Sequence, residues 1–179
     1  MSLTDEGHYG PKQLNLLEVV WGEGFLSPGG TEEIDEIVKN TNLEGKSILD
    51  IGCGCGGAAF HLIKKYKAKS VEGIDPEHLV IETAHKLAKK NNLSELATFK
   101  QIKPGPLKYA DGSFDVVFSK EAFLHIPDKE ALLKDVHRVL KPEGLVIVSD
   151  WMRIDDNPPS AQMKEYIEAE GLDMLMCSL

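Results

Sequence analysis

A glycine-rich turn between a strand and a helix is the segment of this sequence best suited to chemistry. Residues 47–57 read Ser-Ile-Leu-Asp-Ile-Gly-Cys-Gly-Cys-Gly-Gly, so that an apolar strand runs into alternating glycines. Glycines at alternate positions let bare backbone approach a ligand, and the N-terminus of the following helix favours electron-rich groups. A phosphate loop would end in Gly-Lys-Ser/Thr, and a dinucleotide site would read Gly-x-Gly-x-x-Gly. The Gly-Lys-Ser/Thr ending is absent, and the glycines here fall as Gly-x-Gly-x-Gly-Gly behind an Asp, so the glycine spacing by itself is ambiguous.

The pattern that is present indicates a methyl-donor site. Asp50 precedes the glycines as Asp-x-Gly-x-Gly-x-Gly, the form that holds the methionine part of S-adenosylmethionine (SAM), here over Gly52, Cys53 and Gly54. A second acid, Asp75, follows the next strand at a distance of 25 residues. Its carboxylate can accept both ribose hydroxyls, although it could also cap the next helix, and both roles can hold together.

Composition and charge limit the class of protein. The 179 residues are 42% hydrophobic and 27% charged, as in one ordinary globular domain, and the net charge is −9. The acidic balance argues against nucleic acid or an anionic membrane as partner, and no apolar run reaches the length of a membrane span. We expect a cytoplasmic protein. Three cysteines (Cys53, Cys55 and Cys177) are too few and too poorly spaced for a disulfide framework or a zinc site, so no metal is predicted.

Strands and helices alternate, which is typical of a parallel sheet wrapped by helices on both faces. The fold class expected is therefore α/β, with a mostly parallel Rossmann-like sheet. Strands are predicted over 47–51, 70–74, 97–102, 114–118 and 145–149, and helices over 31–41, 58–66, 77–91, 129–140 and about 160–170. The run 141–144, Lys-Pro-Glu-Gly, is expected to end a helix and turn the chain into the fifth strand.

The chain divides into two parts on this interpretation. Residues 1–30 form an N-terminal helix and a lid segment, in which Gly22, Gly24, Gly29 and Gly30 give freedom to move, and residues 31–179 form the SAM-binding core. The antiparallel strands six and seven that such folds normally add have no room after Gly171. Either the protein is short or the sequence is truncated, and we favour truncation. A sheet that ends at strand five would expose an edge, which makes a homodimer possible.

With these motifs, the sequence resembles the class I SAM-dependent methyltransferases over residues 47–149. The matching motifs are the glycine turn, Gly-Ile-Asp-Pro at 73–76, Phe-Asp-Val-Val at 114–117 and Leu-Lys-Pro-Glu-Gly at 140–144. The flanks resemble the phosphoethanolamine N-methyltransferases, with sarcosine and dimethylglycine methyltransferases as neighbours. They read Phe-Leu-Ser-Pro-Gly-Gly at 25–30 and Ser-Lys-Glu-Ala-Phe-Leu-His-Ile at 119–126.

The resemblance implies a role for two residues in catalysis. Tyr9, 20 residues before Gly29, and His125, after the fourth strand, match a Tyr–His pair that locks the substrate in and helps to deprotonate its amine. An amine must be neutral to attack the methyl group in line, and histidine is the residue type suited to accept or relay that proton. His125 could instead be a loop residue before a helix start, and Tyr9 could simply pack.

The resemblance also implies roles in binding. Leu26 and Ser27 match positions that close over SAM, Pro76 follows the ribose acid, and Lys120 matches a basic residue near the cofactor. Glu121 matches an acid that faces the substrate amine. Trp151 is a second candidate for that cation by cation–π contact, although it could equally be core.

Three departures from the family pattern bear on the ligands. Lys103 occupies the place of an acid that bonds the adenine amine, so adenine would be held there by backbone and apolar packing. Glu170 and Leu172 stand where the family has a phosphate-binding Arg and Tyr, and Trp151 replaces another phosphate-contacting Tyr. Because an acid repels phosphate, phosphoethanolamine is not the expected acceptor.

The function expected is transfer of a methyl group from SAM to a small molecule, with an amine nitrogen as the leading acceptor. One alternative is C- or O-methylation of the quinone or lipid biosynthesis type on the same fold. The other is a non-catalytic module that binds SAM or a nucleoside.

Overall fold

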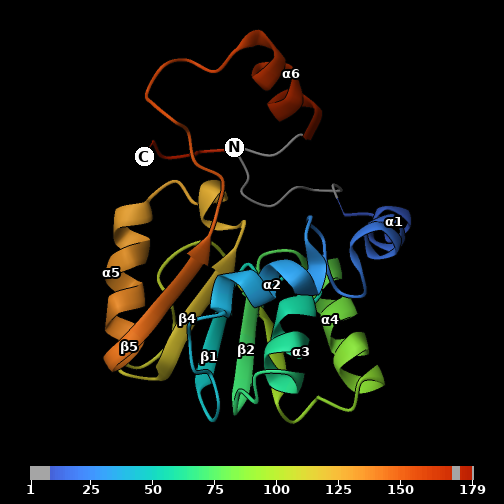
Figure 1. The fold of residues 1–179 in the computed structure, drawn as a ribbon, viewed down its shortest axis with the longest axis vertical. Helices are drawn as coiled ribbons and strands as arrows, with labels where there is room; N and C mark the ends of the chain where they lie inside the picture. Colours follow the sequence, from blue (N-terminus) through green and yellow to red (C-terminus); the bar gives the residue numbers. More distant parts are fainter. Residues whose placement is uncertain (1–8, 171–173, 179) are drawn as a thin grey trace.

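The computed structural model describes residues 9–170 and 174–178, and its five strands form one parallel sheet (Figure 1). The order is β3-β2-β1-β4-β5, so successive strands extend first to one side of β1 and then to the other. The strands are β1 (Ser47–Ile51), β2 (Ser70–Asp75), β3 (Ala97–Gln101), β4 (Phe114–Lys120) and β5 (Leu140–Ser149). The predicted Rossmann-like α/β fold is confirmed.

Helices cover both faces of the sheet. They are α1 (Pro11–Trp21), α2 (Gly30–Val38), α3 (Gly57–Lys64), α4 (His78–Lys90), α5 (Lys129–Val139) and α6 (Ala161–Glu170), with a short 3₁₀ helix, η1 (Phe123–His125). Side chains alternate across a strand, so Ile48 packs into the core under α2, α3 and α4, whereas Leu49 packs into a second core under α5. Burial on both faces explains the near-continuous apolar runs of the central strands β1 and β4, whereas β3 and β5 are partly exposed.

The start of β5 differs from the prediction. The strand begins at Leu140, directly after α5, and not at Leu145. Phe114 of β4 pairs with Leu140 and Val116 pairs with Leu145, so the four residues 141–144 lie opposite a single residue of β4. Glu143 takes a positive φ of 62° within this irregularity. The Lys-Pro-Glu-Gly run is therefore an insertion within the strand, because pairing already starts before it.

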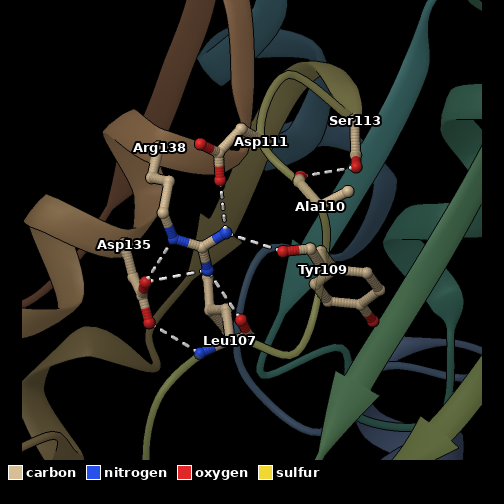
Figure 2. A network of polar contacts seen from close by, with 7 residues as sticks. All are labelled: Leu107, Tyr109, Ala110, Asp111, Ser113, Asp135 and Arg138. Atoms are coloured by element: carbon tan, nitrogen blue, oxygen red, sulfur yellow. Dashed lines mark hydrogen bonds and ion pairs between the residues drawn. The ribbon is translucent and has the colours of Figure 1, made fainter.

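Arg138 of α5 fixes the connection between β3 and β4 through hydrogen bonds and ion pairs (Figure 2). The guanidinium donates to the backbone carbonyls of Leu107 and Tyr109, at 2.7 and 2.6 Å. It also pairs with Asp111 at 3.0 Å and Asp135 at 2.9 Å, and Asp135 in turn accepts the N–H of Leu107 at 2.6 Å. A planar fork of donors suits this set of acceptors, which fixes a segment without regular structure.

Strand β5 lies at one edge of the sheet, beside β4. Leu145, Val146 and Val148 are exposed on it within the part of the chain that the structure describes. This is the edge that the sequence suggested a partner copy could cover, and the homodimer stays a prediction. No helix among the described residues is long and apolar enough to span a membrane.

Candidate active site

A cavity of about 1030 Å³ lies beyond the carboxyl ends of β1, β2 and β4. The strand order places it where the chain reverses between β1 and β4, the position at which open parallel sheets bind ligands. Its walls come from α1, the lid segment (residues 22–30), the glycine turn, the β3–β4 connection, η1 and residues near α6. All but one of the predicted site residues line it: Tyr9, Leu26, Ser27, Asp50, Gly52, Cys53, Gly54, Asp75, Pro76, Lys120, Glu121, His125 and Trp151.

The glycine turn takes the shape that its composition predicts. Gly52, Gly54 and Gly56 have φ of 75°, 53° and 89°, a region that L side chains rarely adopt. A Cβ on Gly52 would lie 2.2 Å from the Cβ of Ala122, so this position has no space for a side chain. The backbone N–H groups of Gly52 and Cys53 both donate to the carbonyl of Ile74, which fixes the turn against β2.

Asp75 holds the turn and the next helix together. One carboxylate oxygen accepts the N–H of Gly54 at 3.1 Å, and the other accepts the N–H of Glu77 at 2.9 Å. Burial raises the pKa of Asp75 to about 6, which the two backbone N–H groups oppose. Each oxygen keeps a lone pair for a further donor, so the capping role and ribose binding are compatible, as the sequence suggested.

Asp50 is the most unusual group of the site. The residue is 1% exposed, and its Oδ2 has no hydrogen-bond partner among the described residues. Burial, and then the negative charge of Asp75, raises the pKa of Asp50 to about 7. A buried carboxylate without a partner is costly, and a cationic donor in the cavity would supply what it lacks. This fits the amino and sulfonium groups of SAM.

The cysteines of the turn are packing groups. Cys53 and Cys55 are both buried, and burial is the largest reason why the pKa of each thiol is raised, to about 12 for Cys55. A thiol of raised pKa is a poor metal ligand or nucleophile. No group of three or more His, Cys, Asp or Glu side chains among the described residues could hold a metal ion.

The lid segment is fastened at both of its ends. The carbonyl of Gly24 accepts the N–H of Gly57 at 3.1 Å, at the start of α3. At the other end, Lys120 donates to Ser27 Oγ at 2.7 Å and to the carbonyl of Pro28 at 2.9 Å. Between these ends, Leu26 covers the glycine turn, since a Cβ on Gly54 would lie 3.3 Å from its Cδ1.

The remaining predicted residues line the cavity as well. We call the part formed by Glu121 and His125, after the end of β4, the acceptor end. Glu121 follows β4 with a positive φ of 53°, and its carboxylate lies 3.2 Å from Lys120 Nζ. His125 ends η1, which is fixed because Asp150 accepts the N–H of Leu124 at 2.9 Å. Tyr9 and His125 line the same cavity, so the structure brings the predicted pair into one site.

Lys103 is the predicted residue that the structure leaves outside. Its side chain is exposed, whereas its neighbours Ile102 and Pro104 line the cavity. Lys103 therefore does not contribute its side chain to this wall. The wall at this end is an apolar and backbone surface that continues to Leu107, the segment that Arg138 holds.

Several lining residues were not predicted. The apolar and aromatic ones come from the two ends of the chain and carry no motif: Leu17, Trp21, Tyr166 and Met174. Asp128 and Asp135 line the cavity as well, although Asp128 also caps α5 by accepting the N–H of Ala131 at 2.9 Å. Only the capping pattern of Asp128 was visible in the sequence.

The charge of the lining is strongly acidic. The carboxylates are those of Asp50, Asp75, Glu77, Glu121, Asp128 and Asp135. The basic side chains are those of Lys120 and His125. Lys120 pairs with Glu121 and Glu33, and Asp135 pairs with Arg138 outside the lining, so the acidic excess rests mainly on the other carboxylates. Among the described residues, the cavity therefore suits a cationic ligand better than an anionic one.

Most of the chain matches a known family of domains, and curated proteins align with it. Residues 42–174 match the family described as "Methyltransferase domain". The chain is 38% identical over 171 residues to phosphoethanolamine N-methyltransferase 1 of Arabidopsis thaliana, an alignment that covers 95% of this chain and 34% of the relative. It is also 38% identical over 112 residues to 2-methyl-6-phytyl-1,4-hydroquinone methyltransferase of Synechocystis sp., covering 63% of this chain and 34% of that protein.

A solved structure supports the same relationship. Phosphoethanolamine N-methyltransferase 2 of Haemonchus contortus, in complex with phosphomonomethylethanolamine and S-adenosylhomocysteine, superposes with a TM-score of 0.84 at 26% identity. The match covers 96% of this chain and 40% of that one. The chain thus spans about a third of the length of these two curated relatives, 34% of each.

Proposed function

The chain belongs to the class I SAM-dependent methyltransferases, and we propose that it transfers a methyl group from SAM to the nitrogen of a small amine. The observation that carries the proposal is Asp50, a buried carboxylate that lacks a hydrogen-bond partner on Oδ2 and lines the cavity at the glycine turn. A ligand that brings a hydrogen-bond donor satisfies it, and a positively charged donor such as the amino group of SAM does so best, because it also stabilises the charged carboxylate.

Each part of the cofactor has a matching wall. The methionine part fits the turn of Asp50, Gly52, Cys53 and Gly54, and the ribose fits Asp75 with Pro76 beside it. Adenine fits the wall that runs from Ile102 to Leu107. When it is bound, SAM supplies an electrophilic methyl group on a sulfonium. Leu26, Ser27 and Lys120 close this half of the cavity from the lid side and exclude water.

The acceptor half supports proton removal from an amine. Glu121 offers a carboxylate to an ammonium group, and the indole of Trp151 can face the same cation. His125 accepts or relays the proton that an amine must lose, and Tyr9 orients His125 across the site. Most of the rate comes from holding the amine nitrogen in line with the methyl group, which these walls do by position.

A second candidate acceptor is a quinol or another apolar molecule that is methylated on carbon or oxygen. The observation that favours it is the apolar and aromatic character of four further lining residues of the cavity, Leu17, Trp21, Tyr166 and Met174. The acidic lining favours the amine. The non-catalytic binding module, a cytoplasmic location and a homodimer stay predictions from the sequence.

The first experiment is calorimetric titration of the chain with SAM and S-adenosylhomocysteine (SAH). We expect micromolar binding that Asp75→Ala abolishes, while Asp156→Ala, a control at an exposed residue that does not line the cavity, leaves the SAM affinity unchanged. Failure of the unaltered chain to bind either ligand would overturn the proposal.

The second experiment is a turnover screen. Ethanolamine, phosphoethanolamine, sarcosine and dimethylglycine test the amine acceptor, and a methyl-phytyl hydroquinone tests the alternative. We expect a non-phosphorylated amine to be methylated and His125→Ala to reduce turnover by about 10²-fold or more with the SAM affinity nearly unchanged. His137→Ala, on the exposed side of α5, is the matched control. SAM binding without methylation of any acceptor would favour the binding module.

A further inference from the structure

Lys120 contacts residues that line the cavity and also one residue, Glu33, that does not. The Lys120 side chain is 7% exposed at the end of β4, so each of its protons requires an acceptor from the protein. Two of the acceptors, Ser27 Oγ and the carbonyl of Pro28, belong to the lid segment. The other two are the carboxylates of Glu33 at 2.9 Å and Glu121 at 3.2 Å.

These four contacts connect three separate parts of the molecule. Ser27 and Pro28 belong to the lid, Glu33 belongs to α2, and Glu121 belongs to the acceptor end of the cavity. The ammonium group has three protons for four acceptors, and Glu121 is the most distant of them. A cationic acceptor can therefore take Glu121 while Lys120 keeps the lid and Glu33.

We propose that Lys120 is the positioning residue that fastens the lid segment over the cofactor, and that Glu33 holds it in place from outside the cavity. This inference rests on the proposed function, because the cofactor is what the lid covers. The glycines at 22, 24, 29 and 30, all with positive φ, allow the lid to swing when these contacts break. Departure of SAH then requires release of Ser27 and Pro28 from Lys120.

Glu33 makes the proposal testable without touching the ligand. It pairs with Lys120 and its side chain lies against Gly29 of the lid segment, but it does not line the cavity. A change there therefore reaches the cofactor through Lys120 or through the lid, and the Lys120→Met background separates these two routes. Glu33→Gln keeps the shape of the side chain and removes its charge. Glu36→Gln is the matched control, since Glu36 lies on the same helix and pairs with the exposed Lys39.

The measurement is the dissociation rate of SAH from the immobilised chain by surface plasmon resonance. We expect Glu33→Gln to speed dissociation by about three- to tenfold, and Glu36→Gln to leave it unchanged. Lys120→Met should speed it at least as much, and adding Glu33→Gln to Lys120→Met should then have no further effect, because the shared contact is already gone.

Two results would overturn the inference. One is a dissociation rate in Glu33→Gln that equals that of Glu36→Gln. The other is the same acceleration by Glu33→Gln in the Lys120→Met background, which would mean that Glu33 acts by another route. If the unaltered chain does not bind SAH at all, the proposed function itself fails, and this outcome is distinct from both.

Discussion

At the scale of single residues, Asp50 and Asp75 make cofactor binding depend on pH. The pKa values of about 7 and about 6 mean that both carboxyls carry protons for part of the time near pH 6.5. A cationic ligand favours the charged carboxylates and lowers both pKa values, so binding must release protons. Ordinary carboxyls on the surface would be charged already and would release none.

We therefore expect SAM affinity to rise from pH 5.5 to 7.5, with protons released on binding at pH 6.5. Calorimetry in two buffers of different ionisation enthalpy measures the number released. Asp50→Asn, which cannot ionise, should reduce proton release at pH 6.5 and flatten the affinity profile. An affinity that does not change over this pH range would contradict the assignment.

Gly52 tests whether the glycine turn depends on its close approach to η1. Gly52 and Gly45 have nearly the same φ, 75° and 71°, but a Cβ meets Ala122 at 2.2 Å in the first case and nothing within 4 Å in the second. Gly45→Ala therefore measures the backbone strain alone. We expect Gly52→Ala to lower the free energy of unfolding by about 1–3 kcal/mol more than Gly45→Ala, measured in urea. Gly52→Ala should also weaken SAH binding, which Gly45→Ala should not do. Equal effects of the two changes on unfolding and on SAH affinity would show that the close approach of Gly52 to Ala122 is unimportant.

At the scale of elements, Arg138 connects α5 to the wall expected to hold adenine (Figure 2). Arg138→Gln removes the donors to Leu107 and Tyr109 and leaves Asp135 without its ion pair. We expect SAM affinity to fall by about tenfold and the free energy of unfolding by about 1–2 kcal/mol. Arg138→Lys should not restore either value, because one ammonium group cannot replace the planar fork.

Lys134 provides the control for Arg138. It lies on the same helix and forms an exposed ion pair with Glu130 at 2.6 Å. Lys134→Gln should leave both SAM affinity and stability unchanged, since an exposed pair of this kind contributes little. Calorimetry and urea unfolding measure the two quantities, and an Arg138→Gln chain that loses stability but keeps its SAM affinity would limit Arg138 to a structural role.

The elements also show what the sequence could and could not predict. The glycine turn and Asp75 depend on local spacing, and the central strands β1 and β4 were placed nearly correctly because burial on both faces leaves apolar runs. The wall that Arg138 holds depends on contacts between distant parts of the chain, and no local signal marks them. Lys103 was expected in the cavity because it occupies the place of the family's adenine-binding acid, but a position in the chain does not tell where the side chain points, and only its neighbours line the cavity. The early start of β5 was missed because the Lys-Pro-Glu-Gly run has the composition of a turn. Such a run can join a helix to a strand or interrupt a strand, and its composition is the same in both cases.

At the scale of the whole molecule, the candidate site weakens the fold that contains it. The raised pKa values of Asp50 and Asp75 lie above the ordinary value of 3.8, so the folded chain binds more protons than the unfolded chain between about pH 4 and 7. Stability is therefore lost as the pH rises through this window. Asp35, Asp115 and Glu23 have lowered pKa values through hydrogen bonds and ion pairs, and they act in the opposite direction. Their effect falls below about pH 4.5, where their unfolded-state carboxyls titrate.

These opposite signs predict a maximum of stability near pH 4.5 to 5 for the chain without cofactor. We expect the free energy of unfolding to fall by roughly 2–4 kcal/mol between pH 5 and 7.5, and Asp50→Asn to remove about two thirds of that fall. Because SAM compensates the charged carboxylates, the stabilisation that a fixed concentration of SAM gives should be larger at pH 7.5 than at pH 5. Urea unfolding at the two pH values, with and without SAM, measures all of these quantities. A stability that rises toward pH 7.5 in the absence of SAM would mean that Asp50 and Asp75 find partners in solution, and the cationic ligand would then lose its main support.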